Sequence, residues 1–395
     1  MIGNTLRKYL LINYLKTSIL VTLIISIFCV LIDFTQTSAH LSTIVHYKSI
    51  FPLIISTLRL PFLLLQVLPS VILLTGVICL YIHNKRYELV ILRSIGLSAW
   101  QFIYPVILAA LLIGIFAILI IDPISAYSLR KSEELLAKWQ GTSYSSNLRN
   151  TPWLIQKTED GETEIRAQYL LNNLTPSEVS KIINNLPNYI DTTKIKESIT
   201  DNNKYIEFNN TSFLYIPKTT TEMPLIQWIQ AKKAILLPNY WLLIDANIYQ
   251  ASTDPKNLPA YLIKTNIKPQ FLETYLTDPY TVPFYLLKEK IDIANNFGSE
   301  PYSYETLLNY LVALPFLLIT MVLIAASFSL NFTRFGNIKI LALASILSGF
   351  MLYVTNSLAQ NLAKAGLISP IIAAWIPVSI ALFFGVYSIL RNEDG

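Results

Sequence analysis

Long apolar runs alternate with one long polar stretch along the 395-residue chain. A helix needs about 20 apolar residues to cross the hydrocarbon core of a bilayer. Runs free of charged residues occupy positions 17–32, 60–82, 94–121, 306–333, 340–363 and 365–390. The first run is short, but Leu10 to Leu15 extend it and Lys16 can reach the headgroups. The pattern predicts an integral membrane α-helical protein with six transmembrane helices, three in residues 1–121 and three in residues 306–395.

The polar stretch, residues 122–305, carries strand signals. Polar and apolar residues alternate from Glu164 to Ala167. The pattern indicates two short strands around an Asn-Asn turn in Lys204 to Ile216, and aromatic and β-branched residues are frequent in Tyr240 to Tyr249. Thr175-Pro176-Ser177-Glu178 is typical of a helix start, and this helix is expected to continue to about Leu186. We therefore expect an inserted β domain with a helical insert.

Composition supports the membrane class. The chain is 53% hydrophobic and only 14% charged, whereas soluble domains carry about 25% charge. The net charge of +5 is uneven, because residues 122–305 sum to −3 and the remainder to +8. A basic membrane part beside a mildly acidic polar part indicates membrane topology and not nucleic-acid binding.

Lysine and arginine in the short loops predict the orientation, because they gather on the cytoplasmic side. With the N-terminus inside, that side holds Arg7, Lys8, Lys85, Arg86, Arg93, Arg334, Lys339 and Arg391. The short segments of the other side hold Lys48, Arg59 and Lys364. We expect both termini in the cytoplasm and residues 122–305 in a periplasm or its equivalent.

The sequence offers no signal for catalysis, metal binding or nucleotide binding. Cys29 and Cys79 lie in apolar runs, and His40, His46 and His83 lack ligand spacing. The chain contains no phosphate-binding loop and no hydrolase motif. We predict no catalytic residues, no metal and no cofactor bound by this chain.

The loop after the second run is amphipathic. Leu89, Leu92 and Ile95 recur at helical spacing, Gly96 suits a helix C-terminus, and Ser98 suits the start of the next helix. Such a helix either connects two spans at the membrane surface or fits a groove of a soluble partner. The pattern alone favours the connector.

Charged residues near the spans lie at their ends. Ion-coupled transport needs ionisable groups near the midplane, and none of the six runs contains one. Asp33 and Asp122 mark outer ends, and Asp122 is interpreted as an interface anchor. Candidate ligands for lipid phosphates are Lys48, Arg59, Arg130 and Lys131; interface anchoring is the alternative. Ser345 and Gly349 allow close helix approach, either within the chain or toward a partner.

Several segments together resemble a known family. They are Tyr87 to Ser98, Pro301 to Leu330 with Ala313-Leu314-Pro315, Gly349 to Val354, Ala373 to Pro377, Trp153 to Ile155 with Gly161, and Trp241 to Leu243. This set resembles the LptF/LptG permeases, the membrane subunits of the lipopolysaccharide export ABC transporter. The ending Glu393-Asp394-Gly395 and the stretch from Pro279 to Ser303 are most similar to LptG chains of alphaproteobacteria.

The resemblance implies an inner-membrane permease with a periplasmic β-jellyroll. It implies an LptF-like second permease, an LptB-like ATPase dimer that holds ATP and Mg, an LptC-like single-span jellyroll protein, and lipopolysaccharide as substrate. It assigns ATPase coupling to a helix at about 85–96, through Arg86, Glu88, Leu89, Leu92, Arg93 and Gly96. It also implies lateral gates between spans one and five of opposing subunits, with Asp33, Ser345 and Gly349 as candidates for gate packing.

One stretch departs from the family. Relatives carry lysines at the outer end of span one, whereas Leu31 to Gln36 contains Asp33 and no lysine. Either the substrate has an altered lipid A charge, or the cationic contacts come from the four candidates above or from the partner. Two other functions remain open: a membrane-anchored scaffold that binds through its outer domain, and a glycolipid-modifying enzyme, which is weakest because no catalytic constellation is present.

Overall fold

The structure is a computed structural model of the whole chain. It describes residues 4–41, 50–88, 91, 94, 96, 98–140, 154–158, 161–184, 205–217, 227–250, 253–265, 267, 278–296, 301–329 and 338–394. Two compact units are present. A helical unit comprises Met1–Ser132, Asp278–Asn295 and Glu300–Gly395, and a β unit comprises Glu133–Thr277 and Asn296–Ser299.

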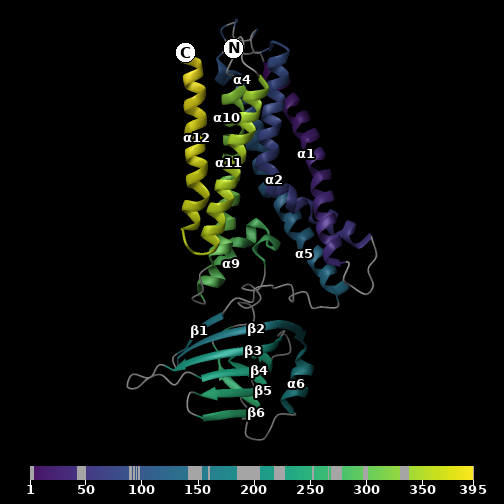
Figure 1. Cartoon of the computed structure of the whole chain (residues 1–395), viewed down its shortest axis with the longest axis vertical. Coiled ribbons are helices and arrows are strands. Elements are labelled where there is room, and N and C mark those ends of the chain that lie inside the picture. Colours follow the sequence, from purple (N-terminus) through teal and green to yellow (C-terminus); the bar gives the residue numbers. More distant parts are fainter. Residues whose placement is uncertain are drawn as a thin grey trace. The chain divides into compact units, whose positions relative to one another are not determined.

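Long helices build the helical unit (Figure 1). They are α1 (Asn4–Leu41), α2 (Ile50–Lys85), α4 (Ala99–Phe116), α10 (Tyr302–Ser329), α11 (Ile338–Lys364) and α12 (Pro370–Asp394). A π-helical turn, Ala117–Ile121, joins α4 to α5 (Asp122–Gln140). A 3-10 turn, Pro279–Thr281, precedes the shorter α9 (Phe284–Asn296).

Five of the described helical segments are long and apolar enough to cross a membrane. They are Leu6–Ala39, Ile50–Lys85, Ala99–Leu136, Tyr302–Ser327 and Pro370–Arg391. α11 has 27 residues and covers the predicted run 340–363, but it is not among these five. The prediction of six spans, three and three, therefore stays a prediction.

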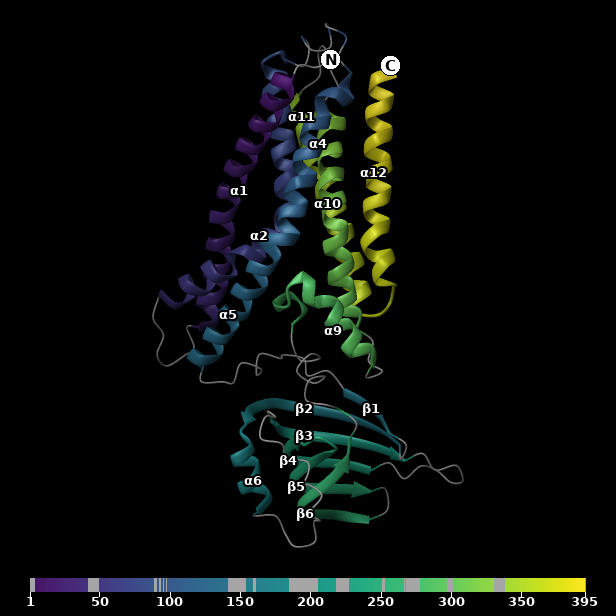
Figure 2. The ribbon, with the colours of Figure 1, turned by 180° about the vertical axis from the view of Figure 1, so that it is seen from behind.

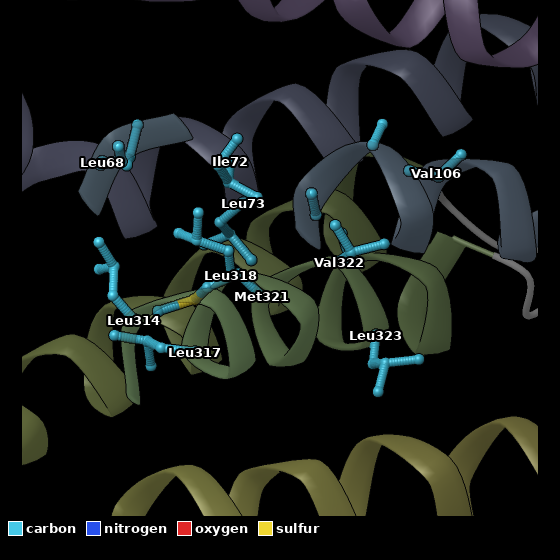
Figure 3. Packing of buried hydrophobic residues seen from close by; sticks show 14 of the residues in the cluster. Leu68, Ile72, Leu73, Val106, Leu314, Leu317, Leu318, Met321, Val322 and Leu323 are labelled. Carbon is cyan, nitrogen blue, oxygen red and sulfur yellow. The ribbon is translucent and has the colours of Figure 1, made fainter. Parts of the chain in front are cut away.

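α10 is the central helix of the helical unit, because it packs against α2, α4, α11 and α12. Figure 3 shows leucine, isoleucine, valine and methionine side chains of α2, α4 and α10 meeting in this core. Val282 and Leu287 belong to the same core. Burial of these side chains draws the segment Asp278–Asn295 into the helical unit, although it lies inside the predicted insert of 122–305.

The first and last helices share one end of the helical unit. In Figures 1 and 2, α1 begins and α12 ends at the same end. α9 lies toward the opposite end of this unit in both views. We call these the terminal end and the α9 end.

The β unit contains one antiparallel sheet. Its strands are β1 (Leu154–Thr158), β2 (Gly161–Leu174), β3 (Tyr205–Pro217), β4 (Gln227–Leu236), β5 (Tyr240–Gln250) and β6 (Thr253–Lys264), and each pairs with the next in chain order. The predicted pair of strands within 204–216 is wrong, because β3 is continuous. The Asn-Asn pair does not reverse the chain; Asn210 has φ 47° and the ladder with β4 continues on both sides of it.

A line of irregular positions crosses the sheet. Asn210 in β3 and Asp245 in β5 both have positive φ. At each of these two residues the alternation of core-facing and outward-facing side chains along the strand shifts by one position. In β5, Trp241 and Leu243 face the core before Asp245, and Ala246 faces it afterwards. Such local changes bend strands sharply.

The bend makes the sheet roll up. Phe208 and Phe213, from opposite sides of the line, both pack against Trp241, with ring centroids 5.7 and 5.6 Å away. The outer strands also meet, because Gln156 of β1 donates to the backbone carbonyl of Lys264 of β6 at 2.9 Å. The antiparallel β class is as predicted, but within the described residues the strand order is a meander. The crossovers that define a jelly roll are not seen there.

The predicted helical insert is present as α6 (Pro176–Asn184). Its residues Val179 and Ile183 are buried against Tyr205, Ile235 and Leu242. In Figure 2 this helix lies alongside the strand ends. Apolar residues four apart on α6 therefore form a second, smaller core of the β unit.

Candidate functional site

The chain turns sharply after α2. The Arg86 N–H donates to the Ile82 carbonyl at 3.1 Å, and the Tyr87 N–H donates to the Asn84 carbonyl at 2.9 Å. Tyr87 then adopts a left-handed conformation with φ 59°. This residue ends the helix and directs the next residue, Glu88, back toward the last turn of α2.

The Glu88 carboxylate is bound within the chain on both oxygens. Oε2 lies 2.6 Å from Nδ1 of His83, and Oε1 accepts from the Tyr9 hydroxyl at 3.3 Å. Nη1 of Arg86 lies 3.9 Å from Oε1. An ionised carboxylate only accepts hydrogen bonds, so Nδ1 of His83 is the donor. The Glu88 side chain nevertheless stays 27% exposed.

The side chains around Glu88 come from α1, α2 and α4. His83 is buried, and its ring packs edge-on against Tyr9 of α1 and Phe102 of α4 at 6.0 and 5.8 Å. Arg7 lies over the Tyr104 ring at 5.9 Å, which is a second contact between α1 and α4. We call His83, Tyr9 and Glu88 the Glu88 cluster.

The structure places part of the predicted coupling segment. It brings Arg86 and Glu88 together, and the Arg86 side chain is exposed. Gly96 has φ 81°, as its predicted place at a helix C-terminus requires. The Ser98 hydroxyl accepts from the Trp100 N–H at 3.2 Å and begins α4. Leu89, Leu92 and Arg93 lie outside the described residues.

Sequence patterns did not indicate His83 or Tyr9 as site residues. The spacing around His83 predicts no ligand role, but the residue lies within α2, is buried and contacts Glu88. Tyr9 is 79 positions away from Glu88. His83 and Glu88 meet through the local turn at Tyr87, and the packing of α1 against α2 and α4 brings Tyr9 to them.

At the α9 end, the charged side chains also have partners within the chain. Nη1 of Arg59 on α2 lies 3.9 Å from Oδ1 of Asp33 on α1. These two residues, predicted for phosphate binding and for gate packing, therefore form one ion pair. Arg130 and Lys131 are exposed on α5, and Lys48 lies outside the described residues.

Two further polar contacts tie α9 and its neighbours to the long helices. The Phe284 N–H donates to Oδ2 of Asp122 at 2.8 Å, so Asp122 caps the start of α9. Lys364 Nζ donates to the Tyr280 hydroxyl at 2.6 Å and lies 4.7 Å from that ring. The Tyr280 ring packs against Phe62. Asp122, interpreted from the sequence as an interface anchor, thus has a defined structural partner.

Gly349 of α11 is buried against α2. A Cβ at this position would collide with the side chain of Leu73. The small residue therefore allows close packing within the chain, which was one of its two interpretations. The Ser345 side chain lies outside the described residues. Within the described part of the chain, His, Cys, Asp and Glu form no group that could hold a metal ion.

The sequence of nearly the whole chain matches a known protein family. The family model described as lipopolysaccharide export system permease LptF/LptG matches residues 8–391. The chain belongs to the LptF/LptG family. The search of curated proteins gave no match.

Membership in the LptF/LptG family covers nearly the whole chain, including both compact units. The protein is therefore a permease of the lipopolysaccharide export system, a transport component of the inner membrane. The apolar helices of the helical unit suit that location. The family resemblance predicted from the sequence is confirmed.

Proposed function

We propose that this chain is one of two permease subunits of an ATP-driven ABC transporter. The transporter extracts lipopolysaccharide from the inner membrane and passes it to a periplasmic bridge toward the outer membrane. The family match over residues 8–391 carries the proposal. The ending Glu393-Asp394-Gly395 favours an LptG-type subunit that pairs with an LptF-like chain.

The proposed topology has six spans, with α11 as the fifth. α1 begins and α12 ends at the same end of the helical unit, which an even number of crossings requires (Figures 1 and 2). Arg7, Lys85, Arg86 and Arg391 belong to the segments at that end. The preference of basic residues for the cytoplasmic side then assigns the terminal end to the cytoplasm and the β unit to the periplasm.

Docking of a separate ATPase at the terminal end follows from this topology. The turn between α2 and α4 is cytoplasmic, and it presents the exposed Arg86 beside a partly exposed Glu88. An LptB-like dimer would hold ATP and Mg and would receive this turn in a groove. A carboxylate at the rim of such a groove pairs with an Arg or Lys of the partner.

Lipid recognition is proposed at the α9 end, where the phosphates of lipopolysaccharide would lie. Asp33 offsets part of the charge of Arg59. The other residues of this chain proposed to bind lipid phosphates are Lys48, Arg130 and Lys131. An LptF-like permease and an LptC-like jellyroll protein complete the cavity and the route into the bridge. The rolled sheet of the β unit would hand the lipid on.

Co-purification and transport test the proposal together. An affinity-tagged chain should bring down a second six-span permease and an ATPase, and the reconstituted complex should transfer lipopolysaccharide to an LptC-like acceptor only with ATP. The control is the same complex with an ATPase that binds but does not hydrolyse ATP. Recovery of the chain alone, with lipid binding but no ATP-dependent transfer, would instead support a membrane-anchored scaffold.

The ion pair between Asp33 and Arg59 allows a test in which two substitutions should change the lipid response in opposite directions. If Arg59 contacts a lipid phosphate, Arg59→Glu should weaken lipid-stimulated ATP hydrolysis, whereas Asp33→Asn should strengthen it by releasing Arg59. Lys131→Glu reports on the exposed face of α5. An unchanged lipid response in all three variants would leave these residues as interface anchors.

A further inference from the structure

Glu88 differs from an ordinary surface glutamate because its direction is fixed. Both oxygens have partners, and the shorter contact, 2.6 Å, is the one to His83. A free glutamate loses rotamer freedom when a partner fixes it, and this loss opposes binding. A side chain that is already held avoids most of that loss on binding.

His83 is suited to hold another side chain because it is itself held. The residue is 2% exposed, and its ring packs edge-on against Tyr9 and Phe102. Nδ1 points at Oε2 of Glu88, although the two residues lie on either side of the left-handed turn at Tyr87. The histidine therefore anchors the residue after the turn to the last turn of α2.

The contact with His83 leaves Glu88 able to bind a partner. Two carboxylate oxygens offer about four acceptor positions, and His83 and Tyr9 each use one. The 27% exposure of the Glu88 side chain leaves an approach for a cation from outside the chain. A charge-assisted bond from a partner Arg or Lys is therefore compatible with the bond from His83.

We propose that His83 is a positioning residue for ATPase docking: it fixes the Glu88 carboxylate toward the ATPase, with Tyr9 as a weaker second support. The proposal rests on the proposed function, since it names how the docking carboxylate is prepared. It also gives α1 a direct contact with the docking group, through the 3.3 Å bond from Tyr9.

The matched variants are His83→Asn and His83→Gln. The asparagine amide nitrogen is as many bonds from Cα as Nδ1 of histidine, whereas glutamine moves its amide outward by one methylene. Both are made in the full permease pair, with Glu88 intact and with Glu88→Ala, which removes the side-chain acceptor. The measurement is the Kd of the purified ATPase for each reconstituted complex, with thermal unfolding of each complex measured in parallel.

With Glu88 intact, His83→Gln should weaken ATPase binding about tenfold, because a charge-assisted bond is lost. His83→Asn should stay within about twofold of wild type, since it restores a donor at the position of Nδ1. In the Glu88→Ala background, the two histidine variants should differ by less than about twofold, because no acceptor is left for either to hold. Tyr9→Phe should cost less than His83→Gln, because its bond is longer.

Different results overturn different claims. Equal losses from His83→Gln in both backgrounds would show that His83 acts independently of Glu88 and would overturn the positioning role. Tight binding by His83→Gln with Glu88 intact would overturn it as well. No ATPase binding by the wild-type permease pair would instead contradict the proposed function.

Discussion

The helical unit and the β unit place their left-handed residues differently. Among the described residues of the helical unit these are Tyr87, Gly96 and Gly366: Tyr87 and Gly366 follow the ends of α2 and α11, and Gly96 lies in a turn before α4. In the β unit they are Asn210 and Asp245, and each lies inside a strand. A left-handed conformation costs most residues other than glycine about 1–2 kcal/mol, so each such position indicates a geometry that the fold requires.

The two placements have different consequences. The left-handed conformation of Tyr87 ends the hydrogen-bonded turns of α2 and directs the Glu88 side chain toward His83. At Asn210 and Asp245 pairing continues on both sides, but the buried alternation shifts by one and the sheet rolls. The same backbone conformation thus directs a side chain in one unit and bends a surface in the other.

The largest effect is expected at the side chain that the Tyr87 turn directs. Glu88→Lys should weaken ATPase docking by at least about a hundredfold, because it places like charges together in a partly dry interface. Glu88→Gln keeps an acceptor and should cost only about tenfold. Pull-down titration and ATPase assays of both complexes measure this. Normal docking and export by Glu88→Lys would leave the turn as a plain connector.

Two glycines sharpen the comparison within the helical unit. Gly366 has φ 74°, and a Cβ there would meet the Tyr302 ring at 2.6 Å; Gly96 has φ 81° with open space around it. Gly366→Ala should therefore destabilise the helical unit by about 2 kcal/mol, from backbone strain together with overpacking. Gly96→Ala carries only the backbone cost of a left-handed alanine, about 1 kcal/mol.

Thermal unfolding of the full chain in detergent compares these two glycine variants. Equal losses of stability would show that Tyr302 moves aside without cost. A larger loss for Gly96→Ala would contradict the assignment of open space around that residue.

The helices were predictable because a long charge-free run has few alternatives in a membrane protein. Five runs reappear in helices long and apolar enough to cross a membrane; α1 and α2 extend beyond their runs at both ends, whereas α4 and α12 begin inside theirs and α10 ends inside its run. The run of α11 also forms a helix. The prediction of α6 from Thr175 and Glu178 succeeded because capping is local, as the bond from the Thr175 N–H to Glu178 shows.

The features that failed are those that depend on contacts distant in sequence. The Asn-Asn pair in β3 is typical of a turn, but pairing with β2 and β4 on both sides keeps the strand continuous. The partners of Glu88 and Arg59 depend on how α1 packs against α2. A charge at the end of an apolar run does not reveal which residue on another helix faces it.

The bend of the β sheet can be tested at Asn210, the positive-φ residue of β3. A β-branched residue tolerates a positive φ poorly, so Asn210→Val should destabilise the β unit by about 1–2 kcal/mol. Asn210→Gly should be neutral or slightly stabilising, since glycine adopts this conformation freely. Hydrogen exchange of residues 205–265 in the full chain measures both variants. Equal protection in the two variants would mean that the bend at Asn210 relaxes easily.

The smallest expected effect is on how the stability of α6 changes with pH. The capping of this helix is local and depends on no left-handed residue in either unit. The backbone N–H and hydroxyl of Thr175 donate to Glu178, and these bonds lower the pKa of Glu178 from its ordinary value of 4.5. A lowered folded-state pKa means that the stabilisation is present above the unfolded pKa and is lost as the pH falls through the folded pKa. Protection of residues 176–184 should therefore fall in acid relative to Glu178→Gln, which accepts the same bonds without titrating. The side chain is exposed, so the difference should be small. Identical pH profiles for both chains would show that the cap does not depend on the charge of Glu178.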